Sequence, residues 1–402
     1  MSEKLASLLA QRGRKCRRSR RHPRLSLARL LSVAGDGSAV AVDRLNRFVN
    51  RLLLLRDPVP LQECKFRFDS FPYVDGAEVD VWIRHALSWQ VPVLIARLGT
   101  NVHTALADHP LVSMHLKRLE LSEVKLTGSY LDLSSCTALE DLKLHACMIC
   151  VDEIFSLSLK RMKITRCNFN FGAITHISVS SLRSPELVDC KGQTPLLESM
   201  PSLERAFVKL GYFDEDRCGK GTDACYCDEA TNAEHSGEDT DEDSYGLCEK
   251  CCGQCANCCD NDNNPPCVLL GGLSSVTYFK LATNSLFTIK RDLKRCPMFS
   301  NLRTLVLDDW YLNDGVPAIF CFLLHTPLLQ TLILKLRKEI EDYDVDKGFS
   351  KSMEWFIYLP HLKVIEVECT TSGNRVGLWE LLKILDVGVK YPQQCTVTVR
   401  RV

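Results

Sequence analysis

One spacing of hydrophobic residues recurs along this chain of 402 residues. An apolar residue is followed by two positions of any kind, a second apolar residue, one further position and a third apolar residue. Most neighbouring copies begin 15 to 33 residues apart, with one longer interruption after the fifth copy. Residues two apart on a β-strand point to the same side, so each copy predicts a short strand with two inward side chains. The nine copies begin at Leu116, Leu139, Leu159, Ile174, Leu203, Val276, Leu302, Leu329 and Leu362.

A single strand of this kind cannot bury its apolar side, but a stack of such strands forms one continuous interior. The spacing matches the LxxLxL strand signature of leucine-rich repeats. Cys147 and Cys167 each follow the last apolar residue of a copy by three positions, where such repeats often place an inward-facing Asn or Cys. The sequence therefore predicts an α/β leucine-rich-repeat solenoid, with a parallel sheet on the concave face and helices or loops on the convex face. Chance matches in a Leu-rich chain are the alternative, which the number and order of the copies disfavour.

The hydrophobic pattern and the composition together divide the chain into five segments. The expected segments are residues 1–40, basic and mostly disordered; 41–98, an N-terminal cap; 99–213, the first half of the repeats; 214–267, an acidic Cys-rich insertion that is disordered; and 268–402, the second half of the repeats with an FBD-like end. Within the cap, residues 44–53 and 80–89 have helical spacing, and residues 64–68 and 91–98 favour strands.

Residues that flank the inward pair of each strand are expected to face solvent on the concave side. This face carries charges of both signs, with Arg161 and Lys163 forming one basic patch. Extended concave surfaces of repeat proteins suit protein recognition, so these residues are the predicted protein-binding site. The alternative is a solvated sheet face without a partner. The candidate residues are Arg118, Glu120, Asp141, Lys143, His145, Arg161, Lys163, Tyr278, Lys280, Asp308, Lys335 and Glu366.

The order of these patterns resembles that of plant F-box/LRR proteins, including the branch with a C-terminal FBD-like segment. The stretches that carry the resemblance are Arg47–Phe68, Val79–Leu94, Leu116–Gly128 and Leu270–Leu281, and the likeness spans roughly residues 40–370. In that family an F-box docks on the adaptor of a cullin ubiquitin ligase, and the repeats capture the substrate. The resemblance implies the same two partners here. The chain departs from the family before residue 40, where residues 12–24 hold eight basic residues and no complete F-box pattern is visible.

Ten of the 21 cysteines lie between Cys218 and Cys267. Their Cys-x-x-Cys spacings suit tetrahedral zinc, but the spacings overlap without a clean loop between two pairs. Fifteen acidic residues against three basic ones in residues 214–262 favour a solvated acidic insertion instead. We therefore expect no bound metal or cofactor, with zinc binding by the insertion as the alternative.

Several other functions are disfavoured by the sequence. No nucleophile-elbow, P-loop or His-Glu-x-x-His motif occurs, so we expect no catalytic residues and no enzyme activity. The net charge is zero, and the basic run at residues 12–24 lacks aromatic residues, so nucleic acid is disfavoured as a partner. A nuclear import signal is an alternative interpretation of that run. The longest apolar stretch, Val316–Leu324, is too short for a membrane span, and no secretory signal is visible. A cytoplasmic or nuclear location is expected.

These patterns favour a substrate-recognition subunit similar to the F-box/LRR adaptors. The alternative is a free-standing leucine-rich-repeat scaffold that binds a protein partner without any ligase.

Overall fold

The fold is α/β, with a large parallel sheet and few helices, which confirms the coarser part of the predicted fold class. The computed structural model describes residues 24–26, 46–47, 49–51, 61–67, 76–97, 105–106, 110–170, 174–210, 269–283, 292–293, 295–310, 316–336, 357–369 and 375–401. The predicted acidic insertion at residues 214–267 lies outside these ranges, as do residues 1–40 except for 24–26, so both predictions of disorder stay predictions.

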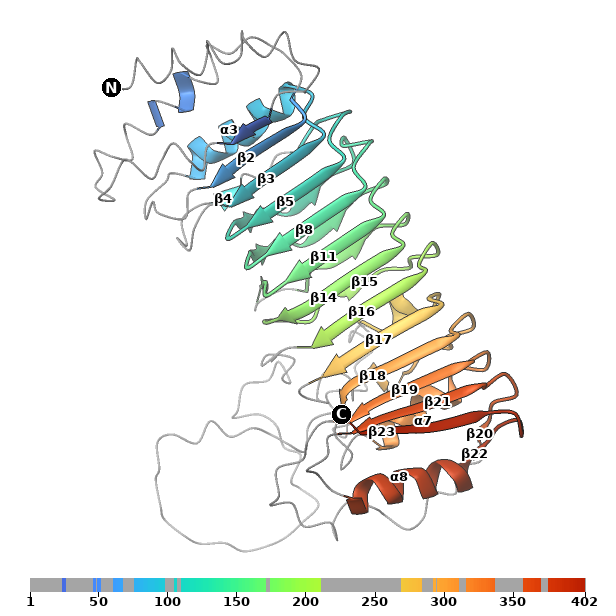
Figure 1. Cartoon of the computed structure of the whole chain (residues 1–402). Coiled ribbons are helices and arrows are strands. Elements are labelled where there is room, and N and C mark those ends of the chain that lie inside the picture. Colours follow the sequence, from blue (N-terminus) through green and yellow to red (C-terminus); the bar gives the residue numbers. More distant parts are fainter. Residues whose placement is uncertain are drawn as a thin grey trace, which may run out of the picture.

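A main sheet of thirteen parallel strands runs the length of the molecule, and Figure 1 shows its strands stacked side by side. Neighbours in this sheet follow one another in the sequence, apart from the short strands and helices that lie between them. We use the word coil for the chain from one main-sheet strand to the next. The strands are β1 (Arg24–Ser26), β2 (Glu63–Arg67), β3 (Val93–Arg97), β5 (Arg118–Ser122), β8 (Asp141–His145), β11 (Arg161–Thr165), β14 (Ser184–Cys190), β16 (Arg205–Leu210), β17 (Tyr278–Thr283), β18 (Thr304–Trp310), β19 (Thr331–Leu336), β21 (Val364–Cys369) and β23 (Thr396–Arg401).

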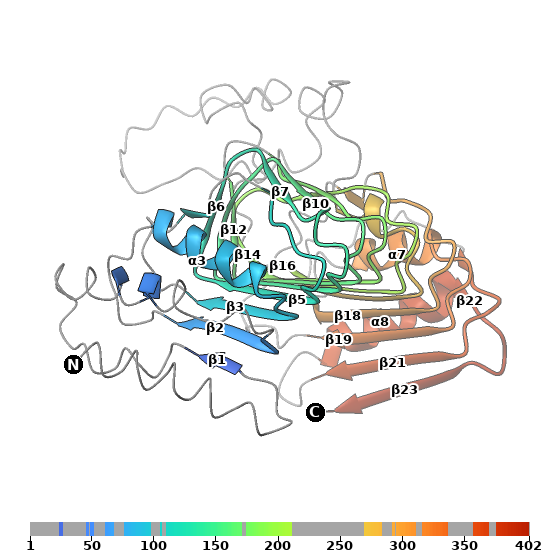
Figure 2. The same ribbon diagram turned by 90° about the horizontal axis from the view of Figure 1, so that it is seen from above.

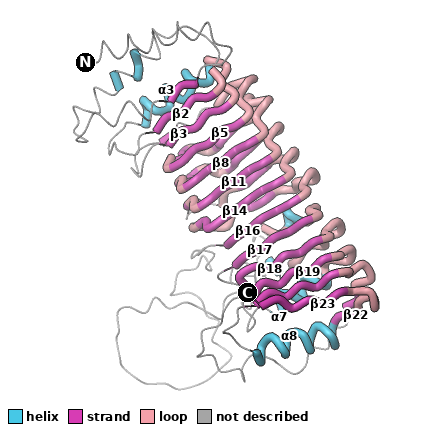
Figure 3. The backbone as a smooth tube through the Cα atoms, viewed as in Figure 1, coloured by secondary structure: helices cyan, strands magenta, loops and turns pink. Residues whose placement is uncertain are grey.

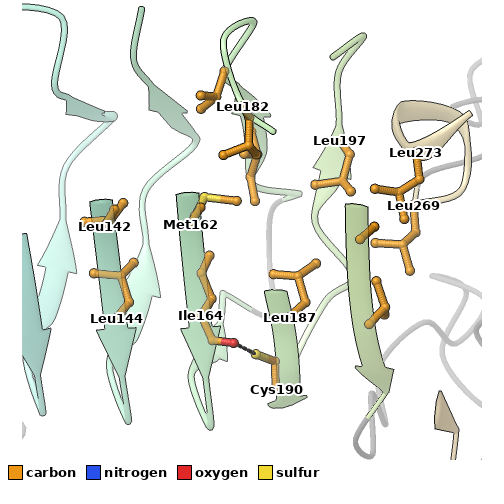
Figure 4. Close-up of a cluster of buried hydrophobic side chains, with 14 of the residues drawn as sticks. Leu142, Leu144, Met162, Ile164, Leu182, Leu187, Cys190, Leu197, Leu269 and Leu273 are labelled. Carbon is orange, nitrogen blue, oxygen red and sulfur yellow. Dashed lines mark hydrogen bonds between the residues drawn. The ribbon is translucent and has the colours of Figure 1, made fainter. Parts of the chain in front are cut away.

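The repeated apolar spacing forms the interior behind this sheet. Leu142 and Leu144 on β8 are each 1% exposed, and they lie in register with Met162 and Ile164 on β11. Figure 4 shows these four side chains on the same side of their strands. Full burial of one such side chain stabilises a fold by about 1.5–3 kcal/mol, so a stack of inward pairs can hold the short strands together.

The stack continues directly across residues 211–268. The backbone N–H groups of Thr277 and Tyr278 donate to the carbonyl oxygen of Glu204 at 3.0 and 3.1 Å. The same pair of bonds joins earlier coils, for example from Lys160 and Arg161 to Glu140. β16 and β17 are therefore neighbours in register, although 73 residues separate Glu204 from Thr277.

Removing residues 214–262 should leave the stack intact. The deletion shortens the spacing from Glu204 to Thr277 to 24 residues, within the range of the other coils. Because a shorter loop costs less entropy to close, the free energy of unfolding should rise by about 1 kcal/mol. Urea denaturation followed by circular dichroism measures this change. A chain that loses its secondary structure on deletion would contradict the direct pairing of β16 with β17.

Two narrow sheets close the coils of the first half. The three coils from β5 to β14 each pass through the main sheet and then through one short strand of each narrow sheet, whereas the coils from β3 to β5 and from β14 to β16 contribute one short strand each. Figure 2 shows these coils nested along the stack. The first narrow sheet contains β4 (Ala105–Leu106), β6 (Lys125–Thr127), β9 (Met148–Cys150) and β12 (Asn168–Phe169); the second contains β7 (Tyr130–Asp132), β10 (Glu153–Phe155), β13 (His176–Ser178) and β15 (Leu196–Leu197). The prediction of helices or loops opposite the main sheet is wrong here, because β-branched and alternating apolar residues pair as short strands instead.

Helical elements cover the corresponding side of the second half, as predicted (Figure 3). The helical elements are the 3-10 helix η2 (Gly271–Leu273), α7 (Val316–Leu324) and α8 (Arg375–Gly388). The second half also contains one pair of short strands, β20 (Ile357–Tyr358) and β22 (Val389–Lys390). Ile319 and Phe322 of α7 are fully buried against the main sheet. Within the described ranges, no helix has both the length and the hydrophobicity needed to cross a bilayer.

The predicted inward cysteines turn the chain out of the main sheet. Ala146 and Arg166 have φ angles of 50° and 54°, and each is followed directly by a buried cysteine, Cys147 or Cys167. The N–H of Cys147 donates to the Cys167 sulfur at 3.3 Å, and Cys190 takes the same place in the next coil. Burial raises the pKa of the Cys190 thiol to about 11. The sulfur atoms of all three cysteines contact backbone carbonyl oxygens at this corner of the coil.

The fourth copy of the apolar spacing occupies a different place from the predicted one. Its strand is β13, which belongs to a narrow sheet, and the main sheet continues instead with β14. β14 follows the same spacing from Leu182 to Leu187, but Pro185 stands at the central apolar position. Pairing of β14 with β16 begins only at Glu186, so the missing N–H of Pro185 does not interrupt that ladder.

Residues 41–98 were expected to cap the array, but they also supply strands to it. β2 and β3 pair with each other and β3 pairs with β5, as the alternating patterns of residues 64–68 and 91–98 allow. α3 (Gly76–Ser88) confirms the second predicted helix, and part of the first is helical at residues 46–47 and 49–51. The indole Nε1–H of Trp82 donates to Asn50 Oδ1 at 2.7 Å, which joins the two helical segments.

Candidate functional site

The solvent-facing side of the main sheet, which we call the open face, is the candidate site. Figure 2 shows both ends of the sheet, β1 and β23, bending toward this side, so the open face is concave. All twelve predicted residues lie here, on β5, β8, β11, β17, β18, β19 and β21, and each is half-buried or exposed. The structure thus brings the predicted set onto one surface, while its role in binding stays a prediction.

Charged residues of the first half are paired with one another across strands. Lys143 Nζ lies 3.1 Å from Glu120 Oε1, and Arg118 also bonds to that carboxylate. Arg161 Nη2 donates to Asp141 Oδ2 at 2.7 Å. Lys163 Nζ donates to Glu186 Oε2 at 2.5 Å, so the predicted basic patch of Arg161 and Lys163 is instead neutralised. The register of β8, β11 and β14 places these partners side by side, which the spacing alone did not indicate.

The Glu120 carboxylate is held in its charged form by this network. Partial burial raises its pKa, but the bonds from Arg118 and Lys143 outweigh burial, and the net pKa lies below the ordinary value. Because the folded-state pKa is depressed, this contribution to stability is complete above the unfolded-state pKa of about 4.5 and is lost as the pH falls through the folded-state value.

Glu120→Gln should therefore lower the free energy of unfolding at pH 7 by about 0.5 kcal/mol, a small effect because water screens the half-exposed cations. The difference from the unchanged chain should begin to shrink as the pH falls below about 4.5, and it should also shrink at high salt. Urea midpoints at several pH values measure it. A deficit that stays constant down to pH 3 would show that the ion pairs are not its source.

Ion pairs also border the open face in the second half. Lys280 Nζ lies 2.6 Å from Asp308 Oδ2, and Lys335 Nζ lies 2.6 Å from Glu368 Oε2. The bond to Glu368 raises the pKa of Lys335. These lysines and carboxylates therefore form ion pairs near the C-terminal ends of β17, β18, β19 and β21.

Beside these ion pairs, toward β16 and the N-terminal ends of the strands, lies a group of uncharged residues that we call the apolar patch. It consists of Phe207, Tyr278, Val306, Ile333 and Val364, all at outward positions of β16 to β21. Lys280 Nζ lies 4.9 Å from the centre of the Phe207 ring. Val306 is 4% exposed, whereas its four companions are half-buried. The candidate list included only Tyr278 of this group, although the apolar residue between Ala206 and Val208 was a visible signal.

Potential metal ligands meet elsewhere, on the side opposite the open face. Cys296, Cys321 and His325 each offer a sulfur or ring nitrogen, and these atoms lie within 4.8 Å of one another. A hydrogen bond with Cys296 lowers the pKa of Cys321 to about 7, despite the opposing effect of burial. The cysteines of the predicted insertion lie outside the described residues. His145 is exposed on the open face, in agreement with its predicted orientation.

Comparisons of the chain with protein-family models, with curated proteins and with solved structures give no match.

Proposed function

We propose that this chain is a leucine-rich-repeat solenoid that captures a protein partner on its open face. The apolar patch is the observation that carries the proposal. Stable protein interfaces commonly have an apolar centre and a polar rim. The register places Phe207 between Glu186 and Lys280, which belong to two separate ion pairs. Aromatic residues near the centre of an interface often provide much of its binding energy.

The pairing of charges on the open face also favours a protein partner over a polyanion. Lys143, Lys163, Lys280 and Lys335 each contact a carboxylate within 3.1 Å, so few of these cations are available for a phosphate backbone. A peptide surface can instead exchange hydrogen bonds with such pairs while covering the apolar patch.

We further propose that the partner is a substrate delivered to a cullin-type ubiquitin ligase, on the basis of the resemblance to F-box/LRR proteins. The full chain and a purified ligase adaptor should then form a complex in size-exclusion chromatography. A chain that captures its partner through the open face but does not bind the adaptor would be a free-standing scaffold.

Site-specific photocrosslinking tests the position of the partner. A photoreactive phenylalanine analogue replaces Phe207 or Ile333 on the open face, and Leu157, which is 61% exposed beyond β10, serves as the matched control position. The same partner should crosslink from both open-face positions and not from position 157.

Binding of the purified partner then gives a quantitative check. Phe207→Ala should weaken affinity about tenfold or more, as expected for an aromatic residue at an interface centre. Leu157→Ala should leave affinity unchanged. Equal crosslinking from position 157, or unchanged affinity after Phe207→Ala, would contradict the proposed binding face.

A further inference from the structure

Three side chains with metal-binding groups converge near α7, far from the open face. Cys321 lies in α7, His325 follows the end of that helix, and Cys296 belongs to the turn that precedes β18. All three are half-buried, and their ligand atoms lie within 4.8 Å of one another. Two thiols and one imidazole form the kind of donor set that zinc prefers in proteins.

The two segments that carry these groups are fixed to each other by the backbone. The N–H of Phe299 donates to the carbonyl oxygen of His325 at 2.8 Å. The turn before Cys296 is anchored as well, because the buried Asp292 carboxylate accepts the N–H groups of Leu269 and Leu270 at 2.7 and 2.8 Å. The backbone segments that carry the donor atoms are therefore held to each other and to the chain that precedes β17.

The orientation of His325 also fits a metal ligand. Its Nδ1 lies 2.7 Å from the carbonyl oxygen of Cys321, one helical turn earlier. Metal-binding histidines commonly donate one ring N–H to a backbone carbonyl, which leaves the other nitrogen with a free lone pair. When Nδ1 of His325 carries the proton and donates to this carbonyl, Nε2 is the nitrogen available to a metal ion.

We propose that Cys296, Cys321 and His325 bind one zinc ion, with water in the fourth position. Zinc–sulfur bonds of about 2.3 Å and zinc–nitrogen bonds of about 2.0 Å place tetrahedral ligand atoms roughly 3.5–3.8 Å apart. The ligand atoms of the three side chains lie 4.8 Å or less from one another, so they must approach by only about 1 Å to bind the ion. Rotation of the side chains can supply that movement. Both thiols lose a proton on binding, and the two thiolates balance the charge of the ion.

Such an ion would tie the end of α7 to the turn before β18, and so would strengthen the second half of the stack. The ten cysteines between Cys218 and Cys267 are further potential metal ligands of the chain. A test must therefore remove that background while keeping the full chain.

Cobalt titration tests the site in a full-length chain whose ten cysteines from Cys218 to Cys267 are changed to serine. Tetrahedral Co²⁺ with thiolate ligands absorbs visible light, and zinc should displace it. We expect saturation at about one ion per chain. Cys321→Ser and His325→Gln should each weaken cobalt binding at least tenfold, whereas Cys369→Ser, a half-buried cysteine on β21, should have no effect.

Thermal unfolding provides a second measurement that does not depend on the variants. Zinc should raise the melting temperature of the serine-background chain, and a chelator should reverse the rise. Absence of the cobalt absorption in that chain would overturn the proposal, as would binding that is unchanged in both ligand variants. A disulfide between Cys296 and Cys321 that persists under reducing purification would also overturn it.

Discussion

Phe279→Ala should lower the free energy of unfolding by about 3–5 kcal/mol, among the largest effects expected for this chain. Phe279 is fully buried on β17, the first main-sheet strand after residues 211–268. Its ring stacks on Phe299 at a centroid distance of 5.9 Å and meets the edge of Phe322 at 6.3 Å. Alanine would leave a cavity between β17, the turn before β18 and α7, which the two remaining rings cannot fill without moving.

Urea denaturation of the full chain measures this loss, with Tyr358→Ala as the control. Tyr358 is 71% exposed on β20, so its replacement should change stability by less than about 0.5 kcal/mol. A loss below about 1 kcal/mol for Phe279→Ala would mean that the second half does not have the packed interior described above.

Gly192→Ala should cost about 3–4 kcal/mol for a different reason. The φ angle of Gly192 is 88°, in a region that residues with a Cβ rarely adopt. An added Cβ would lie 2.1 Å from the carbonyl oxygen of Phe169 in the preceding coil. The backbone at Phe169 cannot shift freely, because it is hydrogen-bonded to the segment that carries Gly192. The N–H of Phe169 donates to the carbonyl oxygen of Lys191, and the N–H of Lys191 donates to the carbonyl oxygen of Cys167.

Lys191→Ala is the matched control, because the neighbouring Lys191 side chain is exposed. It should leave the melting temperature nearly unchanged, whereas Gly192→Ala should lower it by several degrees. Equal melting temperatures for the two variants would show that the coils around Phe169 and Gly192 are not so closely stacked.

The main sheet was largely predictable because its strands repeat one physical requirement. Eight of the nine copies lie at main-sheet strands, since two inward residues per strand are needed wherever the stack continues. The copy at Ile174 met the same requirement in a narrow sheet. This copy begins 15 residues after the preceding one, a shorter spacing than any other, and that difference was the one sequence signal of its different place.

Other features depended on contacts between residues distant in sequence. β14 escaped prediction because Pro185 disfavours a central strand, and only the register shows that its N–H is not needed. The neutralised charges of Arg161 and Lys163 follow from cross-strand register with Asp141 and Glu186. Cys296 lies 25 residues before Cys321, so only the i, i+4 spacing of Cys321 and His325 hinted at their meeting.

The predicted open-face residues were found from alternation alone, since each flanks a buried apolar residue on its strand. The candidate set consists mostly of charged residues and omits Phe207 and Ile333, which carry the proposed binding centre. The same alternation places both of them outward.

Both the fold and the proposed binding face require one unbroken stack from β2 to β21. Hydrogen exchange of the peptides that cover residues 204–210 and 276–283 tests this most directly. In the full chain, and in the chain without residues 214–262, the amides of both peptides should exchange together, on the order of 10³-fold more slowly than an unstructured peptide. Fast exchange in 276–283 while 204–210 stays protected would show that β16 and β17 do not pair, and would contradict the account.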